Sequence, residues 1–170
     1  AREADGGKSL ADFHGRRVAC NSPDSQSGYN VLLKMIAPLS RDGRFFSTVA
    51  FSGSHRQSLR ELQQGTADIA AIDCVTWALL QRHQPEALAG LTVIAHSPLA
   101  PGLPLITSAT TPAATLELLR EALQQLVSDE RYQPLCEALF ICGYSDMRRA
   151  DYQPLLAWRE EAAARGVVRL

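Results

Sequence analysis

Three short stretches of polar residues each follow an apolar run in this sequence. They are residues 21–28 (NSPDSQSG), residues 52–55 (SGSH), and Asp73 with Cys74. In open parallel sheets, ligands bind beyond the carboxyl ends of the strands, where loops lead into helix N-termini. If the first and third predicted strands are neighbours, we expect all three stretches to line one rim of the sheet.

The first stretch holds the donors that a small oxyanion needs. Ser25, Gln26 and Ser27 precede Gly28, where a helical pattern begins. Their side chains would join the free N–H groups of the first helical turn, and the helix dipole favours negative charge there. The alternative is that Asp24 or Ser25 is only an N-cap within a surface loop. No G-x-x-x-x-G-K motif occurs, so the stretch is not a P-loop.

His55 and Asp73 are the ionisable candidates at the other two strand ends. His55 lies four residues before Leu59 at the start of a predicted helix, which turns it toward the inward face. It could donate a hydrogen bond to an anion, or serve as a core or capping histidine. Asp73 ends the apolar run 69–72, where a carboxylate needs partners. It could cap the next helix, position a hydroxyl, or repel doubly charged ligands.

The sequence carries no signature of a hydrolase or of a metal site. It has no G-x-S-x-G elbow, no H-E-x-x-H motif and no C-x-x-C pair among its 4 cysteines. Nothing in the sequence orders a serine, His55 and Asp73 as a triad. We therefore predict a protein that is not an enzyme and needs no metal or cofactor, with an α/β hydrolase as the less favoured alternative.

The pattern along the chain predicts an α/β fold, with an open, mostly parallel sheet and flanking helices, followed by a C-terminal helical tail. Strand-like runs at 17–20, 46–51, 69–72 and 91–95 alternate with helical patterns. The Pro-rich segment 97–104 is expected to be a crossing or hinge, and the pattern is helical after residue 111. The net charge of -1 provides no general attraction for nucleic acid.

Taken in order, several segments resemble the phosphonate-type periplasmic substrate-binding proteins of ABC importers, which have the type II periplasmic binding protein fold. Residues 97–104 look like the return crossover of that family. The resemblance implies that residues 1–107 form one ligand-binding lobe with both crossover segments. It also implies that residues 108–170 are helices that would complete a first lobe outside this chain. The segments that carry the resemblance are residues 9–19, 24–29, 53–58 and 65–73.

The same resemblance implies a set of ligand-binding residues: Ser25, Gln26, Ser27, Gly28, Ser54, His55 and Asp73. The family usually has a Ser-Thr-Ser run where this chain has Ser25, Gln26 and Ser27, so Gln26 departs from the pattern. His55 would contact the anion, and Asp73 would face the organic group of the ligand.

The resemblance also implies partners and a location. The partners would be a small oxyanion such as phosphonate or phosphate and an ABC permease in the membrane. The location would be periplasmic, or anchored through a lipoprotein. A ligand-sensing domain of a signalling system is the alternative function, and the exposed helical tail leaves a homodimer open.

Overall fold

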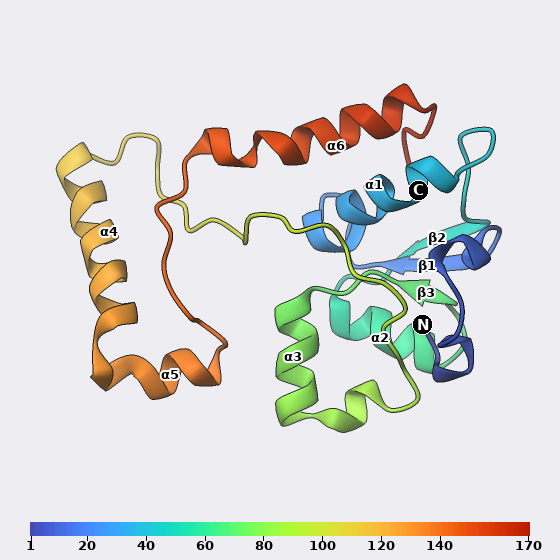
Figure 1. Ribbon diagram of the computed structural model, residues 1–170, viewed down its shortest axis with the longest axis horizontal. Helices are drawn as coiled ribbons and strands as arrows, with labels where there is room; N and C mark the ends of the chain where they lie inside the picture. The colour runs from blue at the N-terminus through green and yellow to red at the C-terminus, as the bar shows by residue number, and fades with distance from the viewer. The chain divides into compact units, whose positions relative to one another are not determined.

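The computed structural model describes residues 1–170 and contains one parallel sheet of three strands (Figure 1). The strand order is β2-β1-β3, with β1 (Arg17–Cys20) between β2 (Thr48–Phe51) and β3 (Ile69–Ala70). In this register Ala19 is the partner of both Ala50 and Ala70. The first and third strands are therefore neighbours, and the residues that follow all three strands share one edge of the sheet.

The α-helices follow the predicted alternation and then the predicted helical tail. They are α1 (Val31–Ile36), α2 (His55–Gln63), α3 (Cys74–His83), α4 (Ala113–Ser128), α5 (Gln133–Ala138) and α6 (Gln153–Ala164). A π-helical turn, η3 (Gln26–Asn30), leads directly into α1. Short 3-10 turns are η1 (Glu3–Asp5), η2 (Leu10–Phe13), η4 (Ala37–Leu39), η5 (Pro85–Leu88), η6 (Glu130–Tyr132) and η7 (Arg149–Tyr152). None of the helices combines the length and the hydrophobicity needed to cross a bilayer.

The strand β1 is buried on both faces of the sheet. Val18 and Cys20 belong to one hydrophobic cluster with residues of α1, while Ala19 belongs to a second cluster with Leu59 of α2 and Leu80 of α3. Helices cover both faces of parallel sheets, which explains the unbroken apolar run of this strand. Cys20 is 0% exposed, and burial raises the pKa of its thiol to about 12.

The last helix packs against the α/β part of the chain. Lys34 of α1 forms an ion pair with Glu161 of α6, and Ala162 and Val167 are buried in the cluster that contains Val18. The chain divides into two compact units, one of residues 1–100 with 153–170 and the other of residues 101–152. The predicted division into ligand-binding lobe and tail at residues 107 and 108 stays a prediction.

The unit formed by residues 101–152 contains α4 and α5. Within it, Arg120 pairs with Glu117 at 2.6 Å and with Asp146 at 2.9 Å. Its helices carry apolar side chains that remain exposed, among them Leu118 (65%) and Leu135 (61%). These leucines have too few neighbours in this chain to be removed from water.

The predicted strand 91–95 is not a strand of the sheet. Leu91 forms only an isolated antiparallel bridge with Arg2. The backbone of Thr92 exchanges hydrogen bonds with Ala1, and the N–H of Glu3 donates to the carbonyl of Gly90 at 2.9 Å. Residues 1–3 therefore pair with residues 90–92 outside the three-stranded sheet.

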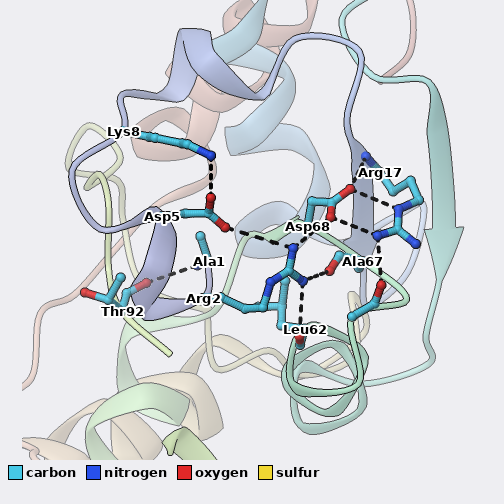
Figure 2. A network of polar contacts seen from close by, with 10 residues as sticks. Ala1, Arg2, Asp5, Lys8, Arg17, Leu62, Ala67, Asp68 and Thr92 are labelled. Carbon is cyan, nitrogen blue, oxygen red and sulfur yellow. Dashed lines mark hydrogen bonds and ion pairs between the residues drawn. The ribbon is translucent and has the colours of Figure 1, made fainter. Parts of the chain in front are cut away.

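An ionic network joins the start of the chain to the amino end of the sheet (Figure 2). The carboxylate of Asp68 accepts hydrogen bonds from Arg17 Nε and Nη2 and from Arg2 Nη2, each at 2.9 Å. Arg2 also donates to the carbonyl of Ala67 at 2.7 Å. Hydrogen bonds from Arg17, followed by those from Arg2, hold the pKa of Asp68 well below its usual range. The network lies at the edge opposite the carboxyl ends of the strands.

Candidate functional site

A widened helical turn stands where β1 leads into α1. The hydroxyl of Ser25 accepts a hydrogen bond from the N–H of Gly28 at 3.0 Å, and the N–H of Asn30 reaches the carbonyl of Ser25 at 2.9 Å. As at the start of any helix, the N–H groups of Gln26 and Ser27, the first two residues of the turn, have no acceptor in the chain. Single π turns occur frequently at functional sites, and two free N–H groups at a helix start suit an anion.

The side chains of Ser27 and His55 meet beside these free N–H groups. Ser27 Oγ lies 3.2 Å from His55 Nε2. His55 is the first residue of α2, which begins there because the hydroxyl of Ser54 caps the N–H of Gln57. Burial lowers the pKa of His55, and the Asp73 carboxylate and the Ala71 backbone oppose this shift only in part. The ring is therefore neutral at pH 7 and carries one hydrogen.

Gly28 is required by close packing rather than by its backbone angles. A Cβ atom on Gly28 would stand 1.8 Å from Asn21 Oδ1 and 3.2 Å from His55 Cε1. The amide of Asn21 therefore lies on the turn next to His55. Both Asn21 Oδ1 and His55 Nδ1 are buried without a hydrogen-bond partner. Buried polar atoms of this kind are rare in native proteins, and both lie beside the π turn.

Asn21 is the residue of this cluster that sequence reasoning did not select. The signal available was its position directly after the buried end of β1, at the rim where ligands bind. Its contact with Gly28 depends on the path of the loop 21–25, which spacing alone does not define. Asn21 thus joins Ser27, Gly28 and His55 in the candidate site.

Three of the predicted residues serve as helix caps. Asp73 Oδ1 accepts from the N–H of Thr76 at 2.8 Å at the start of α3, Ser54 caps α2, and Ser25 caps the π turn. Capping was the alternative reading for Asp73 and Ser25. Asp73 still acts on the site, because its charge raises the pKa of His55 against the effect of burial.

The side chain of Gln26 lies on the side of the π turn that faces α6. Its Oε1 accepts a hydrogen bond from Asn30 Nδ2 at 2.7 Å, and Asn30 Nδ2 also donates to the carbonyl of Leu155 in α6. Ser27 and Gly28, on the other side of the turn, contact His55 and Asn21. If Gln26 binds an oxyanion as predicted, it does so through its backbone N–H and not through its side chain.

The site contains the serine and the histidine of a catalytic triad, Ser27 and His55, but not the carboxylate. A triad needs the base oriented by a carboxylate through its second ring nitrogen. Here His55 Nδ1 has no such partner, and Asp73 Oδ1 is bonded to Thr76 instead. What the site does offer is the N–H groups of Gln26 and Ser27 together with the hydroxyl of Ser27 and the ring of His55. This is a set of hydrogen-bond donors for an oxyanion.

Comparison with known families identifies the chain. Residues 1–152 match the model of a family described as ABC transporter, phosphonate, periplasmic substrate-binding protein. The chain belongs to this family. The resemblance noted in the sequence is thereby confirmed, and the phosphonate-binding family is one of transporter binding proteins rather than enzymes.

Solved structures share the fold of this phosphonate-family chain. XAC2383 from Xanthomonas citri bound to chloride ion aligns with a TM-score of 0.63 and 16% identity, over 98% of this chain and 64% of that chain. XAC2383 bound to ATP aligns with a TM-score of 0.64 and 16% identity, over 98% and 65%. The chain thus spans slightly less than two thirds of these neighbours. No curated protein matches the sequence.

Proposed function

We propose that the protein is the solute-binding component of an ABC importer for a small oxyanion, with phosphate and alkylphosphonates as the candidate ligands. The observation that carries the proposal is the pair of free N–H groups at Gln26 and Ser27, next to the hydrogen bond between Ser27 and His55. Hydrogen bonds from such groups to an ionised oxygen are charge-assisted and about twice as strong as neutral ones. Membership in the phosphonate family supports the same conclusion.

Capture would proceed without covalent chemistry. With its hydrogen on Nε2, His55 donates to Ser27 Oγ, and the hydroxyl hydrogen of Ser27 is then free for an oxygen of the ligand. The N–H groups of Gln26 and Ser27 hold the same anion at the positive end of the turn. Closure of the first lobe over the ligand would exclude water and present the closed form to a permease in the periplasm.

The first lobe would also cover the apolar side chains of α4 and α5, which are expected to complete it. Leu118, Leu119, Leu135 and Leu139 are 65%, 46%, 61% and 52% exposed in this chain. Exposed leucines clustered on helices mark an interaction surface. A further βαβ unit in the complete reading frame is the expected finding, and its absence would contradict this part of the proposal.

Calorimetric titration of the full-length protein with phosphate and with methylphosphonate tests the binding site. We expect Ser27→Ala to weaken binding by about tenfold or more, since a charge-assisted hydrogen bond contributes roughly 1.5–3 kcal/mol. Ser97→Ala is the matched control, because Ser97 is an exposed serine whose hydroxyl bonds only to the neighbouring Pro98 carbonyl. No heat of binding with any oxyanion in a panel would overturn the proposal.

Binding without catalysis has a separate test. The Ser27 and His55 pair lacks an orienting carboxylate on Nδ1, so we expect no hydrolysis of p-nitrophenyl phosphate or p-nitrophenyl acetate above background. Turnover that disappears in His55→Ala would contradict the proposal and favour the α/β hydrolase alternative.

A further inference from the structure

A pair of serine hydroxyls joins the link after β2 to the first turn of α2. Ser52 Oγ lies 2.7 Å from Ser58 Oγ. Ser58 is 0% exposed, and it and Asp68 are the two buried polar residues of the chain. Asp68 is held by its ionic network, whereas a buried serine must use its hydroxyl hydrogen on a neighbour within the protein. The neighbour that Ser58 uses is Ser52.

The direction of these hydrogen bonds follows from the groups available. Ser52 Oγ is the acceptor that the Ser58 hydroxyl has in the chain, so Ser58 donates to Ser52. Ser52 Oγ can then donate to the carbonyl of Ser54 at 2.9 Å or to that of Cys20 at 3.2 Å. The Ser54 carbonyl also accepts the N–H of Ser58 at 3.0 Å. The link of residues 52–54 is therefore bonded to α2 through both side chain and backbone.

The same link is held in register with β1. The N–H of Ser52 donates to the carbonyl of Cys20 at 2.8 Å, and the N–H of Gly53 donates to the carbonyl of Asn21 at 2.9 Å. These bonds continue the parallel pairing of β1 and β2 beyond Phe51. Gly53 then has a φ of 90°, which lets the chain turn into α2. Ser52 therefore connects the end of β1 to the start of α2.

The start of α2 carries His55, whose place depends on this connection. His55 lies three residues before Ser58, so the two side chains lie on one face of the helix. The 3.2 Å between Ser27 Oγ and His55 Nε2 is at the upper end of the normal range for a hydrogen bond. A shift of α2 by roughly 0.5 Å away from the π turn would break the contact.

We propose that Ser52 and Ser58 are positioning residues for the oxyanion site, which hold His55 within hydrogen-bonding distance of Ser27. The inference rests on the proposed function, because it gives both serines a part in binding the same anion. Ser58 is completely buried, so it acts through His55 and not on the ligand. Two apolar side chains could fill the same space, but hydrogen bonds fix direction as well as distance.

Urea unfolding and phosphate titration of the full-length protein separate positioning from a purely structural role. Ser52→Ala should lower the urea midpoint more than Ser58→Ala, because it leaves the buried Ser58 hydroxyl without an acceptor. The double variant removes both hydroxyls and should recover most of the lost stability. Its phosphate affinity should nevertheless stay about three- to tenfold below that of the unaltered protein, the loss expected for one hydrogen bond. Recovery of both stability and affinity would overturn the proposal.

The His55 ring reports its own position without any ligand. In nitrogen–proton NMR spectra of the ligand-free protein, the Nε2 signal of His55 should move in the double variant in the same direction as in Ser27→Ala, because both variants lose one contact. An unmoved signal would also overturn the proposal. If the signal moves but no oxyanion binds the unaltered protein, the proposed function fails while the positioning of His55 by the two serines stands.

Ser40→Ala is the matched control for both measurements. The Ser40 hydroxyl donates to the carbonyl of Ile36 at 2.8 Å, at the end of α1 away from the π turn. Its removal should lower the urea midpoint but leave phosphate affinity and the His55 signal unchanged. Equal effects of Ser40→Ala and the double variant on phosphate affinity would show a general loss of stability, which would contradict positioning.

Discussion

Ser27 Oγ lies 3.2 Å from Nε2 of His55, and this contact joins the π turn after β1 to the first residue of α2. Each of the two residues follows a different strand of the sheet, and the strands are neighbours with parallel register. The pair therefore depends on the sheet for its geometry. The sheet thereby places the Ser27 hydroxyl and the His55 ring beside the two free N–H groups of the turn.

The first prediction concerns energetic coupling within this pair. Ser27→Ala and His55→Ala should each weaken phosphate binding by about ten- to a hundredfold, because each removes part of one chain of hydrogen bonds. The double variant should lose little more than either single variant, since residues in one network are not additive. Titration calorimetry of the four proteins measures the coupling. His96→Ala, which alters an exposed histidine outside the site, should leave binding unchanged, and full additivity would contradict the coupling.

The second prediction is a pH dependence of stability that originates in His55. Burial lowers its pKa in the folded protein, so the folded state binds fewer protons than the unfolded state below about pH 6.5. The stability that depends on neutral His55 is present above that pH and is lost as pH falls toward the lower, folded pKa. Between pH 7.5 and 5.5, His55→Gln should therefore lose less stability than the unaltered protein in urea unfolding.

A bound oxyanion should reverse part of this effect, because a nearby negative charge favours the protonated ring. In saturating phosphate, the difference between the two proteins across this pH range should shrink. Identical pH dependence of the unaltered protein and His55→Gln without ligand would contradict the assignment.

The third prediction concerns the packing of Gly28. A methyl group at this position would meet Asn21 Oδ1 at 1.8 Å, so Gly28→Ala should destabilise the protein by about 1–3 kcal/mol and displace the Asn21 amide. Removing the obstacle in the Gly28→Ala, Asn21→Ala double variant should restore part of that stability. Gly7→Ala is the matched control, since a Cβ there would meet nothing within 4 Å. Urea unfolding of the four proteins measures each step, and a stable Gly28→Ala variant would show that the amide moves freely.

The fourth prediction concerns the ionic network around Asp68 (Figure 2). Asp68→Asn replaces an acceptor oxygen with a donor beside Arg2 and Arg17. It should destabilise the protein, because the Asp68 side chain is only 10% exposed, although its partners Arg2 and Arg17 are 33% and 45% exposed. The pKa of Asp68 is depressed in the folded state, so its contribution is present above about pH 4 and lost in acid. The difference between the two proteins should therefore narrow as pH falls from 4 toward 2.

Asp42→Asn is the control for the fourth prediction. It removes an exposed carboxylate with no ion pair, and asparagine tolerates the positive φ of 50° at that position. Its stability should match that of the unaltered protein. An equally stable Asp68→Asn protein would show that the network contributes nothing.

The sequence was sufficient to predict those elements whose periodicity reflects local burial. The strand 17–20 follows from its apolar run, and the helices after residue 111 follow from the helical pattern of that part of the chain. The run 91–95 looks equally like a strand. In the structure, however, Leu91 and Thr92 pair with Arg2 and Ala1, some 90 residues away in the chain. Periodicity carries no information about such a distant partner.

The candidate site was predictable to a similar extent. Ser27 and His55 could be selected because polar residues after parallel strands meet at one edge. The position of the Gln26 side chain toward α6, and that of Asn21 on Gly28, depend on the π turn and on the packing of α6 against α1. A helical wheel drawn with 3.6 residues per turn would not separate the two sides of that turn as the structure does.

The reaction rate of Cys20 with a thiol reagent reports how often strand β1 opens. Its thiol is 0% exposed and has a pKa of about 12, so it cannot react with a thiol reagent at neutral pH while β1 remains in place. Cys74, which is exposed, should react at once. The rate at which Cys20 is modified therefore measures how often β1, the strand that ends at the oxyanion site, separates from the sheet. Oxyanion ligands should lower the rate of Cys20 modification, and the ligands that bind more tightly should lower it further.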